Sequence, residues 1–243
     1  MRVKIVFSYD GTMFCGYQRQ INGRSVEEEF LKALFNINNH KKTSIVASGR
    51  TDRGVHAIGQ TAHFDIDVDI TLYKLKCALN SILPDDIHVI STKKVDNDFH
   101  ARFMAKRKTY KYVLNMGEYD PLKRNYEYQY NRKLDIKKFQ SATKYFVGKH
   151  DFKNFVSNEA VKDNYEREIY EARVEEIDDK LIFTFVGNGF MKYQVRNMVG
   201  TLLRVAQDKV NDSYIKDLLE FKADSNKVFT IGSEGLYLVS VEY

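Results

Sequence analysis

Apolar and polar residues follow strand-like and helix-like spacings along the first hundred positions. Val3, Ile5 and Phe7 alternate with polar or charged neighbours, which predicts a strand. Apolar residues then recur with helical spacing at 26–35 and 72–82, and further strands are predicted at 43–47, 61–66 and 87–95. The predicted order is strand, helix, strand, strand, helix, strand, which is the ferredoxin-like order.

The second half of the chain has a similar order of predicted elements. A strand at 109–114 precedes a helix at 136–146, with Gly148 placed to end it, and a hairpin follows at 168–186. Helices at 190–206 and after Ser213, and a strand at 236–243, complete the pattern.

We therefore expect an α+β fold of two ferredoxin-like halves, residues 1–102 and 103–243. Their sheets are expected to join into one extended mixed or antiparallel sheet, with the helices on one face. The predicted active-site cleft lies between the halves, because such junctions commonly hold binding sites.

The composition limits which binding partners and which cellular compartment are compatible with the chain. The formal net charge of +5 is compatible with a nucleic-acid partner. Cys15 and Cys77 lie far apart and outside any CxxC pattern, which argues against a disulfide framework and a cysteine zinc site. No signal peptide or long apolar run is visible, so we expect a cytoplasmic protein with no membrane segment.

The histidines and glycines do not match the spacing of known metal or nucleotide sites. His56 and His63 are seven positions apart, and no HxxxH pattern or cysteine partner accompanies them. The chain has neither a phosphate-binding GxxxxGK[ST] loop nor a GxGxxG motif placed after a strand. The sequence therefore gives no support for a catalytic zinc site or for either of these nucleotide-binding motifs.

The stretch 47–64 is the first candidate for chemistry. Asp52 is the one acid in a polar run, and Arg50 and Arg53 flank it among three glycines that permit sharp turns. Opposite charges favour the ionised form of an acid, so Asp52 is a candidate nucleophile. The spacing alone is equally compatible with a salt-bridged surface turn.

The stretch 102–111 is rich in cations and contains no acid. Its aromatic residues, Phe103 and Tyr110, together with the following Tyr112, are interleaved with these cations. Cations neutralise phosphates and rings stack on unpaired bases, so the mixture is typical of RNA binding. A strand with a solvated basic face, in which one of the two tyrosines belongs to the core, is the alternative.

The stretch 187–200 places Arg196 among apolar residues of a predicted helix. A guanidinium near a core needs a partner, and a carboxylate in the cleft is the obvious one. The alternative is an arginine whose side chain extends to water.

Taken together, these segments resemble the TruA family of tRNA pseudouridine synthases along nearly the full chain. The matching blocks are, in order, 7–12 with 16–18, 48–52 with 54–57, 99–103 with 108–110, 150–152, 189–190 with 195–200, and 235–238. The block GRTD with GVHA is highly specific for this family. The other blocks are weak signals individually and become strong together because they occur in the same order. The chain departs from the family pattern at Arg53 and at 230–234, which leaves room for a shifted set of target uridines.

The resemblance implies a role for four residues. Asp52 would be the catalytic nucleophile, and Tyr110 would contact the target uracil and help to remove its C5 proton. Arg196 would pair with Asp52, and Arg50 would occupy the space left by the flipped nucleotide. The sequence leaves open whether Asp52 adds to the base or traps the sugar.

The resemblance also implies the substrate and the assembly. Its members act on uridines 38, 39 and 40 of the tRNA anticodon stem-loop, need no cofactor or metal, and work as homodimers that share a tRNA. The alternatives are a non-catalytic RNA-binding or tRNA-folding protein on the same scaffold, and a glycosylase that releases uracil.

Overall fold

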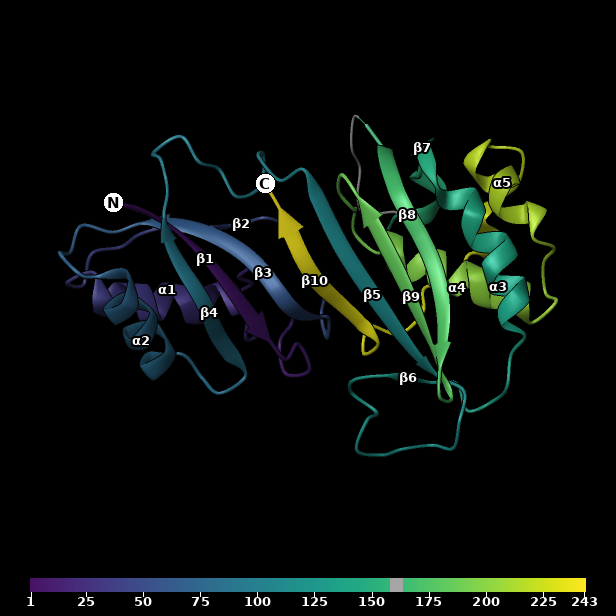
Figure 1. The fold of residues 1–243 in the computed structure, drawn as a ribbon, viewed down its shortest axis with the longest axis horizontal. Helices are drawn as coiled ribbons and strands as arrows, with labels where there is room; N and C mark the ends of the chain where they lie inside the picture. Colours follow the sequence, from purple (N-terminus) through teal and green to yellow (C-terminus); the bar gives the residue numbers. More distant parts are fainter. Residues whose placement is uncertain (158–163) are drawn as a thin grey trace. The chain divides into compact units, whose positions relative to one another are not determined.

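The computed structural model describes residues 1–157 and 164–243, which form two compact units (Figure 1). The first unit is Met1–Lys106 with Tyr237–Tyr243, and the second is Arg107–Leu236. The predicted halves place the last strand in the C-terminal half, whereas that strand packs with the first unit through its pairing with residues His56 and Ala57.

The first unit contains seven strands and helices, of which the first six follow the predicted order. They are β1 (Arg2–Tyr9), α1 (Val26–Ile37), β2 (Ile45–Ala47), β3 (His56–Asp65), α2 (Leu72–Ile82), β4 (Ile87–Lys94) and β10 (Leu236–Glu242). The hydrogen-bonded order is β4-β1-β3-β10, and β2 pairs with β3. The pairs among β1 to β4 are antiparallel, and β10 runs parallel to β3. Strands β1 to β4 and their two helices follow the predicted order, whereas β10 was predicted in the C-terminal half.

The core of the first unit forms on the face of β1 that alternation predicted. Val3, Ile5 and Phe7 are fully buried, and the Phe7 ring packs edge-on against Phe30 of α1, with 4.6 Å between ring centroids. The helix begins where the side chain of Ser25 accepts a hydrogen bond from a backbone N–H of the first turn. An amphipathic helix with a polar cap therefore covers the apolar face of the strand.

The second unit contains the remaining elements. They are β5 (Arg107–Asn115), β6 (Tyr128–Gln129), α3 (Ile136–Thr143), β7 (Gly148–Asp151), β8 (Glu166–Ile177), β9 (Lys180–Gly187), α4 (Gln194–Ala206) and α5 (Ser213–Leu219), with 3-10 turns at Lys144–Phe146, Lys153–Phe155 and Ser225–Lys227. The strand order is β5-β9-β8-β7, and β6 pairs with β5. The α+β class and one extended mixed sheet are thus confirmed, and within the described residues this sheet has ten strands.

Several boundaries in the second unit differ from the prediction. Helix α4 begins at Gln194 rather than at residue 190, because Tyr193 has a left-handed backbone with φ of 65°. Helix α3 ends at Thr143 and a 3-10 turn carries the chain to Phe146, while Gly148, with φ of 112°, begins the unpredicted strand β7.

Within the described parts of the chain, none of the helices combines the length and the hydrophobicity required to cross a bilayer.

Candidate active site

Asp52 lies in the loop 48–55, which joins β2 to β3 in the first unit. The loop leaves β2 where the Ser48 N–H donates to the Thr61 carbonyl at 2.7 Å, and it turns where the Val55 N–H donates to the Asp52 carbonyl at 3.2 Å. Asp52 is partly buried, whereas Arg50 is exposed. The acid is therefore held at the surface of the unit and is not extended into bulk solvent.

Four buried polar side chains form hydrogen bonds within or to this loop. The Tyr9 hydroxyl hydrogen-bonds the Thr51 hydroxyl at 2.8 Å. The Ser48 hydroxyl donates to Gln60 Oε1 at 2.7 Å, and Gln60 Nε2 donates to the Gly49 carbonyl at 3.1 Å. We call Tyr9, Ser48, Thr51 and Gln60 the loop-support residues. They bond the chain on both sides of Arg50 and so restrict the backbone that carries Asp52.

Burial changes the acidity of one loop-support residue. Removal from water raises the pKa of the Tyr9 hydroxyl to about 12, although hydrogen bonds with Thr51 and Gln60 act in the opposite direction. Tyr9 therefore stays a neutral hydroxyl at physiological pH and can both donate and accept.

A second loop, residues 10–25, packs against the Asp52 loop. The Tyr17 N–H donates to the Thr51 carbonyl at 3.1 Å, and the Gly54 N–H donates to the Phe14 carbonyl at 3.3 Å. Gly16 has φ of +116°, and a Cβ at this position would lie 3.0 Å from the Thr51 oxygen. Glycine is required here because the two backbones approach closely and the conformation is left-handed.

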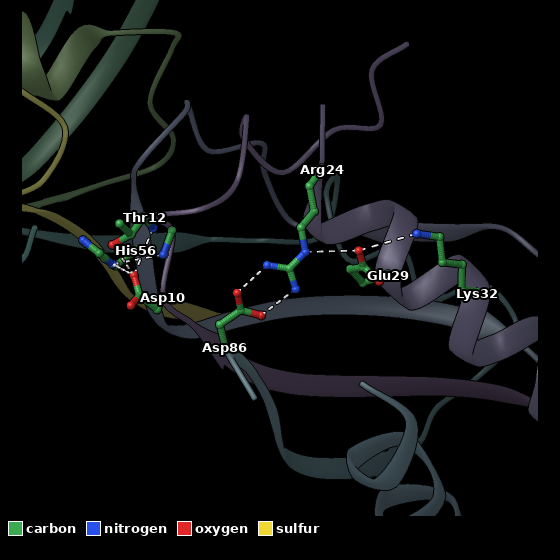
Figure 2. Close-up of polar contacts among 8 residues, drawn as sticks. Asp10, Thr12, Arg24, Glu29, Lys32, His56 and Asp86 are labelled. Atoms are coloured by element: carbon green, nitrogen blue, oxygen red, sulfur yellow. Dashed lines mark hydrogen bonds and ion pairs between the residues drawn. The ribbon is translucent and has the colours of Figure 1, made fainter. Parts of the chain in front are cut away.

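The start of this second loop is shaped by contacts around Asp10 (Figure 2). Asp10 Oδ1 accepts hydrogen bonds from the backbone N–H and the hydroxyl of Thr12, at 2.9 and 2.6 Å. His56 Nδ1 accepts a hydrogen bond from the Gly11 N–H at 3.0 Å, so this nitrogen carries no proton in that arrangement. The 3.2 Å approach of Asp10 to the same nitrogen becomes an ion pair only when His56 is protonated.

Arg24 ties the far end of the second loop to the start of β4 (Figure 2). Its guanidinium binds both oxygens of Asp86, at 2.5 and 2.9 Å, and its Nε donates to Glu29 at 3.3 Å. The hydrogen bond with Asp86 raises the pKa of Arg24. The guanidinium carbon also lies 4.3 Å from the centre of the Phe14 ring. A bidentate pair with a stacked ring fixes the plane of this side chain.

The predicted uracil-contacting residue, Tyr110, lies on β5 of the second unit. It is 8% exposed, and its ring packs edge-on against Phe190, with 5.1 Å between centroids. Tyr112, two residues further along the strand, is fully buried and donates its hydroxyl to the Gly232 carbonyl at 2.8 Å. Both tyrosines thus belong to the core, and Tyr112 is the more deeply buried of the two.

Arg196 lies in the first turn of α4, partly buried. Its Nε donates to the Ile231 carbonyl at 2.8 Å, and its guanidinium carbon lies 4.8 Å from the centre of the Tyr193 ring. These contacts orient the guanidinium.

The four predicted site residues fall in two different units. Asp52 and Arg50 belong to the first unit, and Tyr110 and Arg196 belong to the second. Their meeting at one site, including the pair between Arg196 and Asp52, stays a prediction. The loop-support residues were not predicted, although Ser48 and Gln60 carried a signal as polar residues beside apolar strand positions.

Known proteins resemble this chain along its whole length. Residues 5–104 and 142–243 match the family described as tRNA pseudouridine synthase. The tRNA pseudouridine synthase A of Streptococcus uberis is 43% identical over 245 residues, covering 100% of this chain and 98% of that protein. The tRNA pseudouridine synthase A 1 of Bacillus cereus is 43% identical over 246 residues, with the same coverage.

A third relative, the tRNA pseudouridine synthase A of an Exiguobacterium species, is 41% identical over 242 residues and again covers 100% of this chain and 98% of that protein. These similarities extend across both compact units and include the loop around Asp52. The chain therefore belongs to the TruA-type tRNA pseudouridine synthases and is an isomerase that converts uridine to pseudouridine in tRNA.

Proposed function

We propose that this enzyme isomerises uridines 38, 39 and 40 in the tRNA anticodon stem-loop, with Asp52 as its catalytic nucleophile. The reaction breaks the bond between C1′ and N1 of uridine and forms one between C1′ and C5. The proton on C5 is lost, and N1 gains one. Substrate and product are isomers, so the overall change requires no oxidant, reductant or external group.

The position of Asp52 is the observation that carries this proposal. Its carboxylate is partly buried in a loop that buried hydrogen bonds hold on both sides. The positive charges of Arg50 and Arg53 in the same loop favour the ionised form, which is the nucleophilic one. An ionised oxygen in a restrained loop is suited to form a transient bond, either to the uracil ring or to C1′.

The target nucleoside must leave its stack before the carboxylate reaches it, at a cost of roughly a few kcal/mol. We propose that Arg50 offsets part of this cost by filling the vacated space. Its exposed side chain, two residues from Asp52 on the same loop, supports that role.

Two residues of the second unit complete the proposed site. Tyr110 contacts the extruded uracil and accepts or relays the C5 proton, and Arg196 pairs with Asp52. The support is that the Tyr110 ring is fixed against Phe190, and that the Ile231 carbonyl orients the Arg196 guanidinium. The family resemblance alone supports a homodimer that shares a tRNA and independence of cofactors.

The test is pseudouridine mapping at single-nucleotide resolution on an unmodified tRNA transcript. We expect the Asp52→Asn enzyme to lose more than about 1,000-fold in rate, because an amide is not a nucleophile of this kind. Asp69→Asn, which removes an exposed carboxylate of the same unit, is the matched control and should leave the rate unchanged.

Four outcomes would overturn parts of the proposal. Wild-type rates in Asp52→Asn would refute the nucleophile. Pseudouridine only outside positions 38 to 40 would refute the assigned target. Release of free uracil would identify a glycosylase, and tRNA binding without any product would identify the non-catalytic binding protein.

A further inference from the structure

The loop that follows β4 presents one aromatic ring to solvent in a fixed orientation. Phe103 is 78% exposed. Its ring stacks on His100, with 4.2 Å between centroids and 24° between planes. The guanidinium carbon of Arg102 lies 5.9 Å from the centre of the same ring. His100 thus covers one face of the Phe103 ring, and 78% of the residue stays exposed to solvent.

The base of this loop is anchored in the first unit. Ala101 is fully buried; its N–H donates to His63 Nδ1 at 3.1 Å, and its carbonyl accepts from the Tyr243 hydroxyl at 2.8 Å. Burial, and the positive charge of Arg2, lower the pKa of His63 and favour the neutral ring whose Nδ1 accepts this hydrogen bond. Both polar atoms of the Ala101 backbone are therefore bound before any ligand arrives.

The turn itself is closed by His100. Its Nδ1 accepts from the backbone N–H groups of Arg102 and Phe103, each at 3.2 Å, and its carbonyl accepts from the Met104 N–H at 3.0 Å. The His100 side chain thus caps the turn through one ring nitrogen and supports Phe103 through its ring face. Little conformational freedom remains for binding to remove, which lowers the entropic cost of association.

The surroundings of Phe103 in the sequence favour an anionic partner. Residues 99–111 include five cations and no acid. A single exposed aromatic residue is ordinary on a protein surface. This one differs because it is held by a second ring and stands in a positively charged segment.

We propose that Phe103 is a stacking platform for an unpaired base of the tRNA, with Arg102 contacting a neighbouring phosphate. The proposal rests on tRNA being the substrate, and it concerns residues other than the four assigned to catalysis. Unpaired bases stack on aromatic rings irrespective of sequence, because every base has a π face. The platform is therefore expected to support affinity and positioning without selecting a base.

The experiment compares Phe103→Ala, Phe103→Leu and Phe103→Tyr in binding an unmodified tRNA transcript. Stacking predicts roughly 5- to 150-fold weaker binding for the alanine and leucine variants. Phe103→Tyr keeps the ring and should bind like wild type. Tyr73→Ala, which removes a ring that is 77% exposed on α2, is the matched control and should leave the Kd unchanged.

The kinetics give a second readout that a folding defect would not reproduce. Phe103→Ala and Phe103→Leu should raise KM for tRNA and leave kcat at saturating tRNA near the wild-type value, because the proposal assigns the ring to binding and not to the reacting atoms. Arg102→Gln should reduce the slope of log affinity against log salt by about 1, as expected for one lost phosphate contact.

Two results would overturn the platform. One is a Phe103→Ala enzyme whose Kd and KM equal those of the wild type. The other is a Phe103→Leu enzyme that binds as well as Phe103→Tyr, which would show that apolar bulk suffices. Neither result would affect the Asp52→Asn test of the nucleophile. Conversely, if Asp52 proved not to be the nucleophile, the Kd values of the Phe103 variants would still test the platform.

Discussion

The hydrogen bond between Tyr9 and Thr51 provides a direct test of how the fold positions Asp52. Tyr9→Phe removes one oxygen from a site where both residues are buried, and it keeps the ring that packs against Phe7 and Phe14. The Thr51 hydroxyl then loses its 2.8 Å partner. Loss of a partner for a buried hydroxyl costs about 1 to 3 kcal/mol, so we expect the free energy of unfolding to fall by about 1 to 2 kcal/mol.

A double-mutant cycle with Thr51→Val isolates the contact from other effects of each substitution. The double variant should be more stable than the sum of the single changes by about 1 kcal/mol, because the second substitution removes the orphaned hydroxyl. Unfolding in urea is followed by circular dichroism and tyrosine fluorescence, and free energies are compared where both probes report one transition. Tyr119→Phe, at an exposed tyrosine, is the control and should change stability by less than about 0.5 kcal/mol.

The catalytic consequence of Tyr9→Phe follows from the chain itself, since Thr51 immediately precedes Asp52. A loop that loses one of its side-chain bonds holds the carboxylate less firmly, so kcat should fall by about 10-fold or more even where the variant is folded. A coupling energy below about 0.3 kcal/mol, together with an unchanged kcat, would refute the assignment of these residues as supports of the loop.

Three further changes test other parts of the same framework. Burial raises the pKa of Tyr9 to about 12 in the folded protein. The neutral Tyr9 hydroxyl therefore contributes its full stability below the ordinary tyrosine pKa, and this contribution is lost as the pH rises toward the folded-state pKa. When the pH rises from about 10 to 12, the free energy of unfolding should fall in the wild type by roughly 2 to 3 kcal/mol more than in Tyr9→Phe, as measured by urea titration at each pH. An equal fall in both proteins would contradict this prediction. Gly16→Ala should cost about 1 to 3 kcal/mol and lower kcat, whereas Gly189→Ala, where a Cβ meets nothing closer than 3.8 Å, should change neither. Arg24→Lys loses the bidentate contact with Asp86 and should lower the thermal midpoint by a few degrees; a midpoint equal to that of wild type would show that one charge suffices.

Most of the secondary structure follows from the local pattern. The α2 helix occupies Leu72–Ile82, as predicted, because its apolar residues recur with helical spacing and Thr71 caps its first turn. Strand β7, at Gly148–Asp151, escaped prediction because it is short and has no apolar alternation. Its extended shape comes from pairing with β8, which lies further along the chain.

The start of α4 and the length of β3 also differ from the local pattern. Residues 190–193 continue the helical pattern, but the left-handed backbone at Tyr193 delays the helix. β3 begins at His56, earlier than its apolar pattern indicates, because β10 pairs with its first residues. Pairing with another strand therefore overrides the local preference of a polar, glycine-containing segment.

The sequence by itself determined the family, the kind of chemistry and the candidate nucleophile, because the residues that carry this signal are neighbours in the GRTD and GVHA block. The tertiary structure alone decided what supports Asp52 and which aromatic residues are buried. Tyr9 meets Thr51 from 42 positions away, Tyr112 meets Gly232 from 120, and His63 fixes Ala101 from 38. Local patterns report periodicity and turn chemistry, whereas the burial and hydrogen-bond partner of a polar group depend on which distant segments the fold brings together.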